Sequence, residues 1–285
     1  MIFVFLSVLC SVLVSVLLKL TRRLQIDVGH AIAWNYVVTS ALTAWLLHPT
    51  LQTLRGPGVP WPALVALGIL LPTIFLALAA AVRHAGIVRS DAAQRLSLLL
   101  SLLAAFVLFG EQLDAVKLAG IALGLLALLG MIWRTGNTVT AASHAAWVYP
   151  VLVFAGFGVI DILFKRVALA GIPLGDSLQA MFALAWVVAF AMQLWRRLHD
   201  AVRFTARSAL AGLLLGGANF GNILFYLRGH RALPAHPALV FASMNIGVVA
   251  LGAVVGLLVF HERLSRLNLA SIVLAAVAIG VIAWP

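Results

Sequence analysis

Ten long apolar runs dominate the sequence and limit what the chain can fold into. Each run is close to the ~20 apolar residues that a membrane-spanning helix needs. The runs cover residues 2–20, 30–48, 63–82, 87–109, 115–133, 146–164, 177–195, 209–227, 237–260 and 267–284. Hydrophobic residues make up 64% of the chain and charged residues only 9%, which excludes an ordinary soluble enzyme, a disordered chain and a coiled coil. The sequence predicts an all-α integral membrane protein with ten transmembrane helices.

The two halves of the chain resemble each other. Glu111 and Leu113 stand before the fifth run, and Glu262 and Leu264 stand before the tenth, at an offset of 151; over 22 aligned positions from Gly110, seven residues are identical. A second similarity between the halves is that of Ser15-x-x-x-Lys19 to Asp161-x-x-x-Lys165. We predict one five-helix repeat over 1–133, a linker over 134–145 and a second repeat over 146–285. Since five is odd, the repeats would have opposite orientations in the membrane.

Two five-helix repeats, each with Glu-x-Leu before its last helix, resemble the EamA-type members of the drug/metabolite transporter superfamily. The resemblance covers essentially the whole chain. It implies a secondary transporter that moves a small organic solute, such as a metabolite, an amino acid or a drug-like compound, by alternating access. The alternative is a flippase or an export subunit for a lipid-linked small molecule. Neither is an enzyme, and the expected location is the plasma membrane, as a multi-pass protein of a bacterial inner membrane.

Polar side chains inside apolar helices are candidates for the solute site, because each is costly in hydrocarbon unless it is paired or faces a water-filled cavity. Asp91, Gln94 and Arg95 form the most polar helical turn. Asp91 and Arg95 have the favourable i,i+4 order of acid before base. Two interpretations stay open: a structural ion pair at a helix end, or the polar floor of a central pocket in which Arg95 binds a carboxylate or phosphate.

Helices six, eight and nine supply the other candidates. Asp161 and Lys165 are again an i,i+4 pair, either a structural pair or a coupling site, and Lys165 could instead extend to the membrane interface. The asparagines can form hydrogen bonds between helices or can bind the solute. Those predicted to contact the solute are Asn219, Asn222 and Asn245, and Asn35 is a weaker candidate. Glu111 and Glu262 are expected to have a structural role at the start of the following helix.

The remaining features set the expected partners. The net charge of +11 comes from scattered basic residues, which favours contacts with lipid headgroups over nucleic acid. No sequence pattern for a metal, a nucleotide or another cofactor is present, so we expect none. The partners are a small-molecule solute and membrane lipids, and the protein is a monomer or homodimer. The distribution of basic residues favours termini outside the cell, whereas the resemblance implies termini in the cytoplasm. Both predict that the two termini lie on the same side of the membrane.

Overall fold

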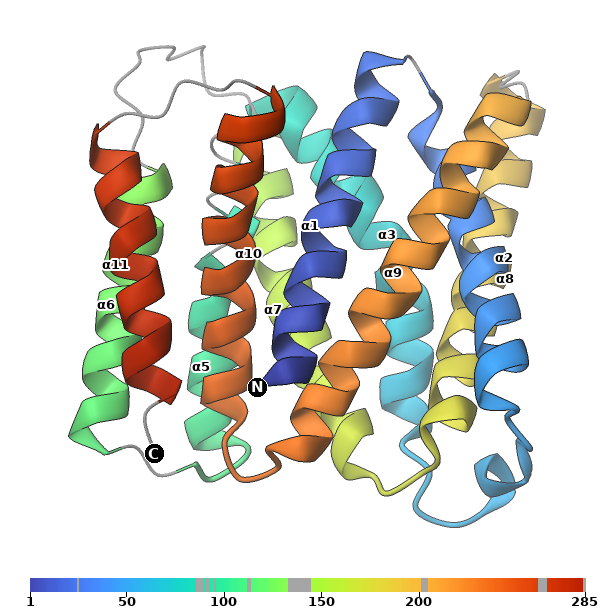
Figure 1. Cartoon of the computed structure of the whole chain (residues 1–285). Coiled ribbons are helices and arrows are strands. Elements are labelled where there is room, and N and C mark those ends of the chain that lie inside the picture. The colour runs from blue at the N-terminus through green and yellow to red at the C-terminus, as the bar shows by residue number, and fades with distance from the viewer. Residues whose placement is uncertain are drawn as a thin grey trace. The chain divides into compact units, whose positions relative to one another are not determined.

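The computed structural model describes residues 1–24, 26–85, 90, 93–94, 96–111, 114–132, 145–200, 205–260 and 266–283, and all regular structure in them is helical (Figure 1). Ten α-helices lie in these residues, together with the 3-10 helix η1 (Gln52–Arg55). The α-helices are α1 (Ile2–Arg23), α2 (Val28–Leu47), α3 (Trp61–Ala85), α5 (Leu98–Val107), α6 (Ala115–Ile132), α7 (Ala145–Leu169), α8 (Leu174–Asp200), α9 (Ala206–Ala232), α10 (Pro237–Phe260) and α11 (Arg266–Ala283).

Each of the ten predicted spans overlaps one of these helices, which confirms the predicted fold class. Four helices are long and apolar enough to cross a membrane, judged by length and composition over the described residues: α3, α8, α9 and α10. Shorter apolar stretches lie in α1, α5, α6 and α11. Three helices end five residues later than predicted: α8 at Asp200, α9 at Ala232, and α7 at Leu169, so that α7 includes Lys165 in its last turns.

The chain divides into two compact units. Unit 1 contains Met1–Val8, Ala77–Ile162 and Ala232–Pro285, and unit 2 contains Leu9–Leu76 and Leu163–Arg231. Each unit combines helices from both halves of the sequence, so the units are a different division from the predicted repeats. The first residues of α1 and the last residues of α11 both belong to unit 1 and lie toward the same side of it (Figure 1).

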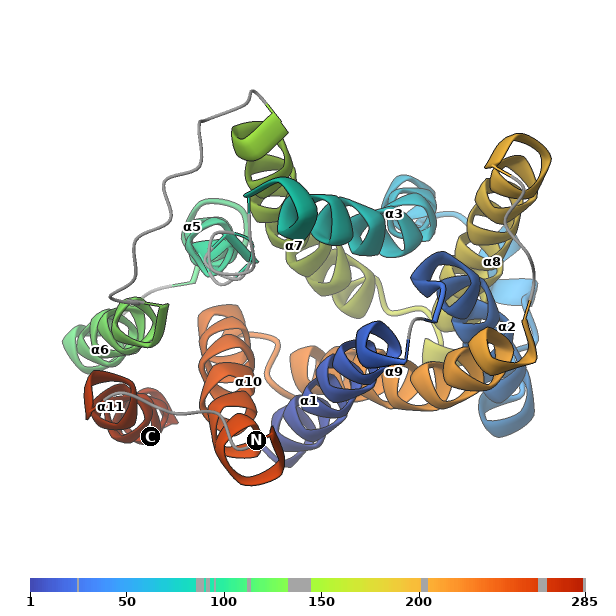
Figure 2. The same cartoon turned by 90° about the horizontal axis from the view of Figure 1, so that it is seen from above.

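Helices of the two halves pack against each other within each unit. In unit 1, α6 packs on α11, as both views show, and α5 packs on α10 (Figure 1 and Figure 2). In unit 2, α2 packs extensively on α8. Glycine allows α9 to approach α2 closely: a Cβ added at Gly212 would lie 2.5 Å from the Ala31 carbonyl oxygen. Only a residue without a side chain fits such a contact.

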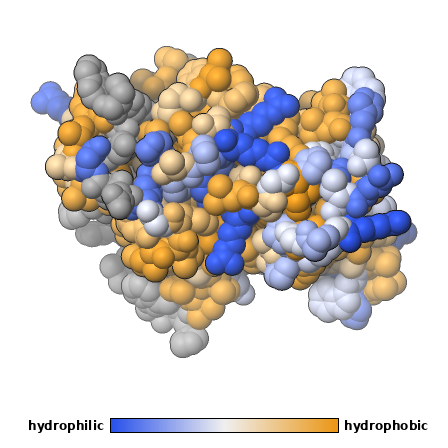
Figure 3. Space-filling view, turned by 90° about the horizontal axis from the view of Figure 1, so that it is seen from below, coloured by the Kyte–Doolittle hydropathy of each residue, from blue (hydrophilic) through white to orange (hydrophobic). Residues whose placement is uncertain are grey.

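Large apolar side chains are exposed on the outside of both units. Examples are Phe5, Trp45, Val107, Leu198 and Val273, each at least 60% exposed. Seen from below, apolar side chains cover much of the surface and hydrophilic ones form separate groups (Figure 3). A soluble protein rarely exposes large contiguous apolar area, whereas a membrane protein presents such area to acyl chains.

Candidate functional site

The interior of unit 2 contains a polar cluster where α9 lies against α2. Asn35 and Tyr36 of α2 and Asn219 of α9 are each at most 4% exposed. The Tyr36 hydroxyl lies beside the Asn219 side chain. The contact is not a well-formed hydrogen bond, since both the phenol oxygen and Asn219 Nδ2 lack one among the described residues, as do both polar atoms of the Asn35 side chain. Buried polar groups are nearly always satisfied, so this cluster is a candidate site for a ligand or for water.

Glycines bring the members of this cluster together. A Cβ added at Gly216 would lie 2.8 Å from the carbonyl oxygen of Asn35 and 2.6 Å from the Cβ of Val38. The backbone of α9 therefore touches α2 one turn from Asn219. Gly216 permits this close approach, and Asn219 is the predicted site residue that lies beside it. Asn222, also on α9, is half-buried.

A second buried group lies toward the end of α9. Lys165 of α7 and His230 of α9 are fully buried and interact electrostatically. The Tyr226 ring meets the His230 ring edge-on, with centroids 4.7 Å apart, and meets Phe164 in the same way at 5.8 Å. The expectation that Lys165 extends to the membrane interface is wrong, because α7 continues past it and packs its side chain inside unit 2. Asp161 lies one turn before Lys165 on α7.

The unit 1 candidates have local partners. Ser101 of α5 donates a hydrogen bond of 2.8 Å to Asp161 Oδ2, which gives the half-buried carboxylate a partner on another helix. Asn245 Nδ2 donates to the Phe241 carbonyl oxygen of its own helix at 3.1 Å. Gln94 is half-buried, and its backbone carbonyl accepts a hydrogen bond from Ser97 Oγ. Asp91 and Arg95, predicted to pair beside Gln94, lie outside the described residues.

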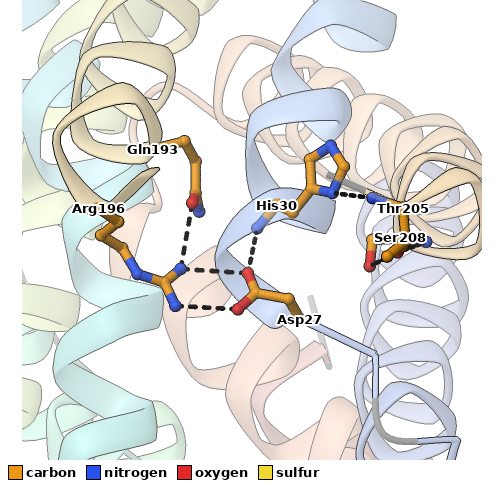
Figure 4. Close-up of polar contacts among 6 residues, drawn as sticks. All are labelled: Asp27, His30, Gln193, Arg196, Thr205 and Ser208. Atoms are coloured by element: carbon orange, nitrogen blue, oxygen red, sulfur yellow. Dashed lines mark hydrogen bonds and ion pairs between the residues drawn. The ribbon is translucent and has the colours of Figure 1, made fainter. Parts of the chain in front are cut away.

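An ion pair that the sequence did not indicate joins α2 and α8 in unit 2 (Figure 4). Arg196 donates to both carboxylate oxygens of Asp27, at 2.9 and 3.1 Å, and also to Gln193 Oε1 at 3.1 Å. Asp27 is the N-cap of α2 and accepts a 2.7 Å hydrogen bond from the His30 backbone N–H. Burial alone would raise the pKa of the Asp27 carboxyl, but the hydrogen bonds and the charge of Arg196 outweigh it and hold the pKa below its ordinary value.

Two further carboxylates have structural contacts. Glu111 is 8% exposed and accepts a 2.6 Å hydrogen bond from the Ala238 backbone N–H, in the first turn of α10. The sequence predicts a structural role for Glu111 at the start of the next helix, and this contact gives it such a role at the start of α10. Asp176, in the first turn of α8, accepts a hydrogen bond from Thr53 Oγ1 of η1. Glu262 lies outside the described residues.

An apolar groove runs along the outside of unit 2 between α2, α8 and α9. Its volume is about 570 Å³. We call it the aromatic groove, because Trp34, Trp186 and Phe190 form much of its wall. One end is more polar and is lined by His30 and Thr205, whose backbone N–H donates to His30 Nδ1 at 3.4 Å (Figure 4).

The sequence is similar to that of a known protein over nearly its whole length. The sequence pattern of the EamA-like transporter family matches residues 1–133. An uncharacterised protein of Haemophilus influenzae is 41% identical over 278 residues, which cover 96% of this chain and 94% of that protein. The chain belongs to the EamA-like transporter family. A solved crystal structure shares the fold of this EamA-like transporter, with a TM-score of 0.74 and 18% identity over 99% of this chain and 95% of that one.

Family membership settles the general activity of this EamA-like protein. It is a multi-pass membrane protein of a family that transports small solutes and is not an enzyme family. Sequence reasoning missed Tyr36, His230 and the Asp27–Arg196 pair. Only Asp27 carries a local signal, since an aspartate directly before an apolar run is typical of an N-cap. In the described residues, no group of three or more His, Cys, Asp or Glu is arranged to hold a metal ion.

Proposed function

We propose that this protein is a secondary transporter that binds a small polar or amphipathic organic solute at the Asn35–Tyr36–Asn219 cluster and moves it by alternating access. The observation that carries the proposal is the set of buried polar atoms without hydrogen bonds in this cluster. Leaving such a group unsatisfied costs about 1–3 kcal/mol. A solute that supplies donors and acceptors would recover that cost on binding.

The pairing of helices supports the proposed inverted repeats over 1–133 and 146–285. The second and seventh helices (α2 and α8), the fourth and ninth (α5 and α10), and the fifth and tenth (α6 and α11) pack on each other. Each is a pair of the same position in the two repeats. A pseudo-two-fold axis between repeats brings equivalent helices together in this way, and such repeats are the usual basis of alternating access.

The chemistry of the cluster favours a neutral hydrogen-bonding group on the solute. Amides and a phenol donate and accept hydrogen bonds but carry no charge. Lys165, buried on α7 in the same unit, supplies the positive charge that an anionic part of a solute would use. The aromatic ring of Tyr226, which packs on His230, and that of Phe164, which packs on Tyr226, suit an apolar part of an amphipathic solute.

Binding and transport measurements test the proposal directly. A thermal-shift screen of the purified protein with amino acids, sugars, nucleosides and cationic drugs would identify a stabilising compound, because a ligand of the folded state raises apparent stability. Uptake of that compound into proteoliposomes should fall about tenfold or more in Asn219→Leu and in Tyr36→Phe, since each loses a hydrogen-bonding group worth ~1.4 kcal/mol or more. Unchanged uptake in both variants would refute the site.

Thr43→Val is the matched control for these variants. Thr43 is also buried in α2, but its hydroxyl donates to the Thr39 carbonyl oxygen at 2.7 Å and needs no solute. The control should keep wild-type uptake. Equal losses in all three variants would show general damage to unit 2 and would also contradict the assignment.

Asp161 is the proposed coupling residue. Its carboxylate lies in the middle of α7 and is bound by Ser101 of α5, so protonation would change a contact between two helices. Uptake driven by an imposed pH gradient should be lost in Asp161→Asn, while equilibrium exchange of the solute continues. Flux that is independent of the pH gradient in the wild-type protein would remove Asp161 from this role.

The remaining proposals concern location and alternatives. We place the protein in a bacterial inner membrane, as a monomer or homodimer, with the bacterial relative as support. A flippase or an export subunit for a lipid-linked molecule is the second candidate, and the aromatic groove on the outside of unit 2 favours it. Movement of a fluorescent lipid-linked compound between leaflets of proteoliposomes would support that candidate over solute uptake.

A further inference from the structure

We propose that His30 is a proton-sensitive positioning residue: its neutral ring joins the start of α9 to α2, and protonation of the ring releases this contact. The contact lies where the interface between these two helices begins, inside unit 2. The expected effect on transport rests on the proposed solute site, which lies further along the same two helices. The effect on the contact between the helices does not depend on the solute.

Both ring nitrogens of His30 face hydrogen-bond donors. The indole Nε1 of Trp34, one turn later on α2, lies 3.0 Å from His30 Nε2. The backbone nitrogen of Thr205, directly before α9, lies 3.4 Å from His30 Nδ1 (Figure 4). A neutral imidazole has one acceptor nitrogen, so each of its two tautomers accepts one of these hydrogen bonds. A protonated ring carries N–H groups at both nitrogens and accepts neither, so protonation replaces a hydrogen bond with a contact between donors.

The position of the ring also disfavours a positive charge on it. His30 is only 3% exposed, and a buried charge is costly unless it is paired. The ring belongs to the first turn of α2 and contacts Thr205, whose hydroxyl accepts a 3.2 Å hydrogen bond from the Ser208 N–H in the first turn of α9. The start of a helix carries a partial positive charge. An imidazolium at this point is therefore repelled by the starts of two helices.

The charged side chains around the ring offset each other. Asp27 of α2 attracts a protonated His30, but its carboxylate is already bound through both oxygens by Arg196 of α8. On the α9 side, Thr205 carries no charge and the side chain of Arg207 is exposed. The donors at the two ring nitrogens therefore decide the direction of the effect, and protonation weakens the contact between α2 and α9.

The contact at His30 is the first of a series along α9. After Thr205 come Gly212 and Gly216, and at each of them the backbone of α9 closely approaches a carbonyl oxygen of α2. Asn219, a residue of the proposed solute site, lies about one turn beyond Gly216. Release of the start of α9 loosens the interface that holds this site, so acidification should slow transport.

Hydrogen exchange of the full-length, detergent-solubilised protein tests the release directly. His30→Gln keeps a side chain with a hydrogen-bond acceptor but cannot be protonated. The wild-type protein and this variant are compared at about pH 8 and about pH 5.5, on either side of the ~6.5 at which an ordinary histidine changes charge. Comparison at the same pH cancels the intrinsic effect of pH on exchange. Backbone amides in the first turns of α9 should exchange at equal rates at pH 8 and about tenfold faster in the wild-type protein at pH 5.5, as expected for one lost hydrogen bond.

His199→Gln is the matched control. His199 is an exposed histidine near the end of α8 in the same unit, and its Nδ1 lies 2.9 Å from the carbonyl oxygen of Trp195. A protonated ring still donates to a carbonyl oxygen, so this variant should keep the wild-type exchange of α9 at both pH values. The unfolding temperature of each variant at pH 8 shows that it is folded.

Two exchange results would overturn the proposal. One is equal exchange of α9 in the wild-type protein and His30→Gln at both pH values. The other is loss of the pH response in His199→Gln, which would assign the response to unit 2 in general. Equilibrium exchange of the solute, with equal pH on both sides of proteoliposomes, then tests the link to transport: acidification should slow it in the wild-type protein and not in His30→Gln. If the amides respond and solute exchange does not, the role of His30 is supported and the solute site between α2 and α9 is contradicted.

Discussion

Breaking the Asp27–Arg196 pair should lower the stability of unit 2 by an amount that reveals how the two residues are coupled. The pair links the start of α2 to the last turns of α8, two helices that pack along their length. Each side chain is 28% exposed, so solvent screens the pair only in part. We compare Asp27→Ala, Arg196→Ala and the double variant in a double-mutant cycle, which isolates the pairwise energy.

The structure gives the expected size of each effect. Arg196 makes two charge-assisted hydrogen bonds to Asp27, at 2.9 and 3.1 Å. Hydrogen bonds to charged groups contribute about 1.5–3 kcal/mol when buried, and partial exposure reduces this to a coupling of roughly 1–2 kcal/mol. Asp27→Ala also removes the N-cap of α2, at a cost of about 1 kcal/mol. We expect losses of about 2–3 kcal/mol for Asp27→Ala and 1–2 kcal/mol for Arg196→Ala.

The stability of the double variant shows whether Asp27 and Arg196 act mainly on each other. If the residues act mainly on each other, it should be about as stable as Asp27→Ala alone. Unfolding free energies from titration with sodium dodecyl sulfate in mixed micelles, followed by circular dichroism, supply the four values. Arg166→Ala, at an exposed position near the end of α7, is the control and should change stability by less than about 0.5 kcal/mol. Single losses that add in the double variant would refute the coupling.

Three other predictions follow from single contacts. The pKa of Asp27 is lowered in the folded state. The stability that its carboxylate contributes is therefore complete above its unfolded pKa of ~3.9 and is lost as the pH falls through the lower folded pKa. Melting temperatures at pH 7 and pH 3 should differ less in Asp27→Asn than in the wild-type protein. Gly216→Ala should lower the free energy of unfolding by about 1–3 kcal/mol, since the added Cβ would clash with α2. Gly217→Ala meets open space, so it should be neutral or should stabilise the protein by up to ~1 kcal/mol. Thermal melts compare the two variants. Glu111→Ala should destabilise by about 1–2 kcal/mol in the same assay, because the buried N–H of Ala238 loses its acceptor, and an unchanged melt would contradict this role.

The helices could be predicted because their signal is local. Each apolar run is long enough to span a bilayer, and each breaker contains Pro, Gly or charged residues that end a run. The bounds were harder to predict where polar residues continue a helix. Lys165 and Arg166 follow the predicted span 146–164, but both lie in α7, since a helix can bury or expose such side chains according to its neighbours.

The contacts between distant residues could not be predicted in the same way. Asp27 and Arg196 are 169 positions apart, and nothing local in either segment indicates the other. The same applies to Asn35 and Asn219, because neither segment carries a local signal of the other. Their proximity depends on the packing of α9 on α2, which glycines permit but do not specify.

Polarity inside a membrane helix is therefore not sufficient to identify a binding residue, and hydrogen bonding supplies the missing criterion. The hydroxyls of Thr43, Thr73 and Ser271 donate to carbonyl oxygens one turn earlier in their own helices, as does the Asn245 amide. A helix can accommodate such side chains anywhere, because the backbone itself satisfies them. The Asn35 amide and the Tyr36 hydroxyl have no such partner among the described residues although both are buried. A transporter has to offer its solute groups that the protein leaves unsatisfied, and for this reason we assign the solute to these residues of unit 2 and not to Asn245.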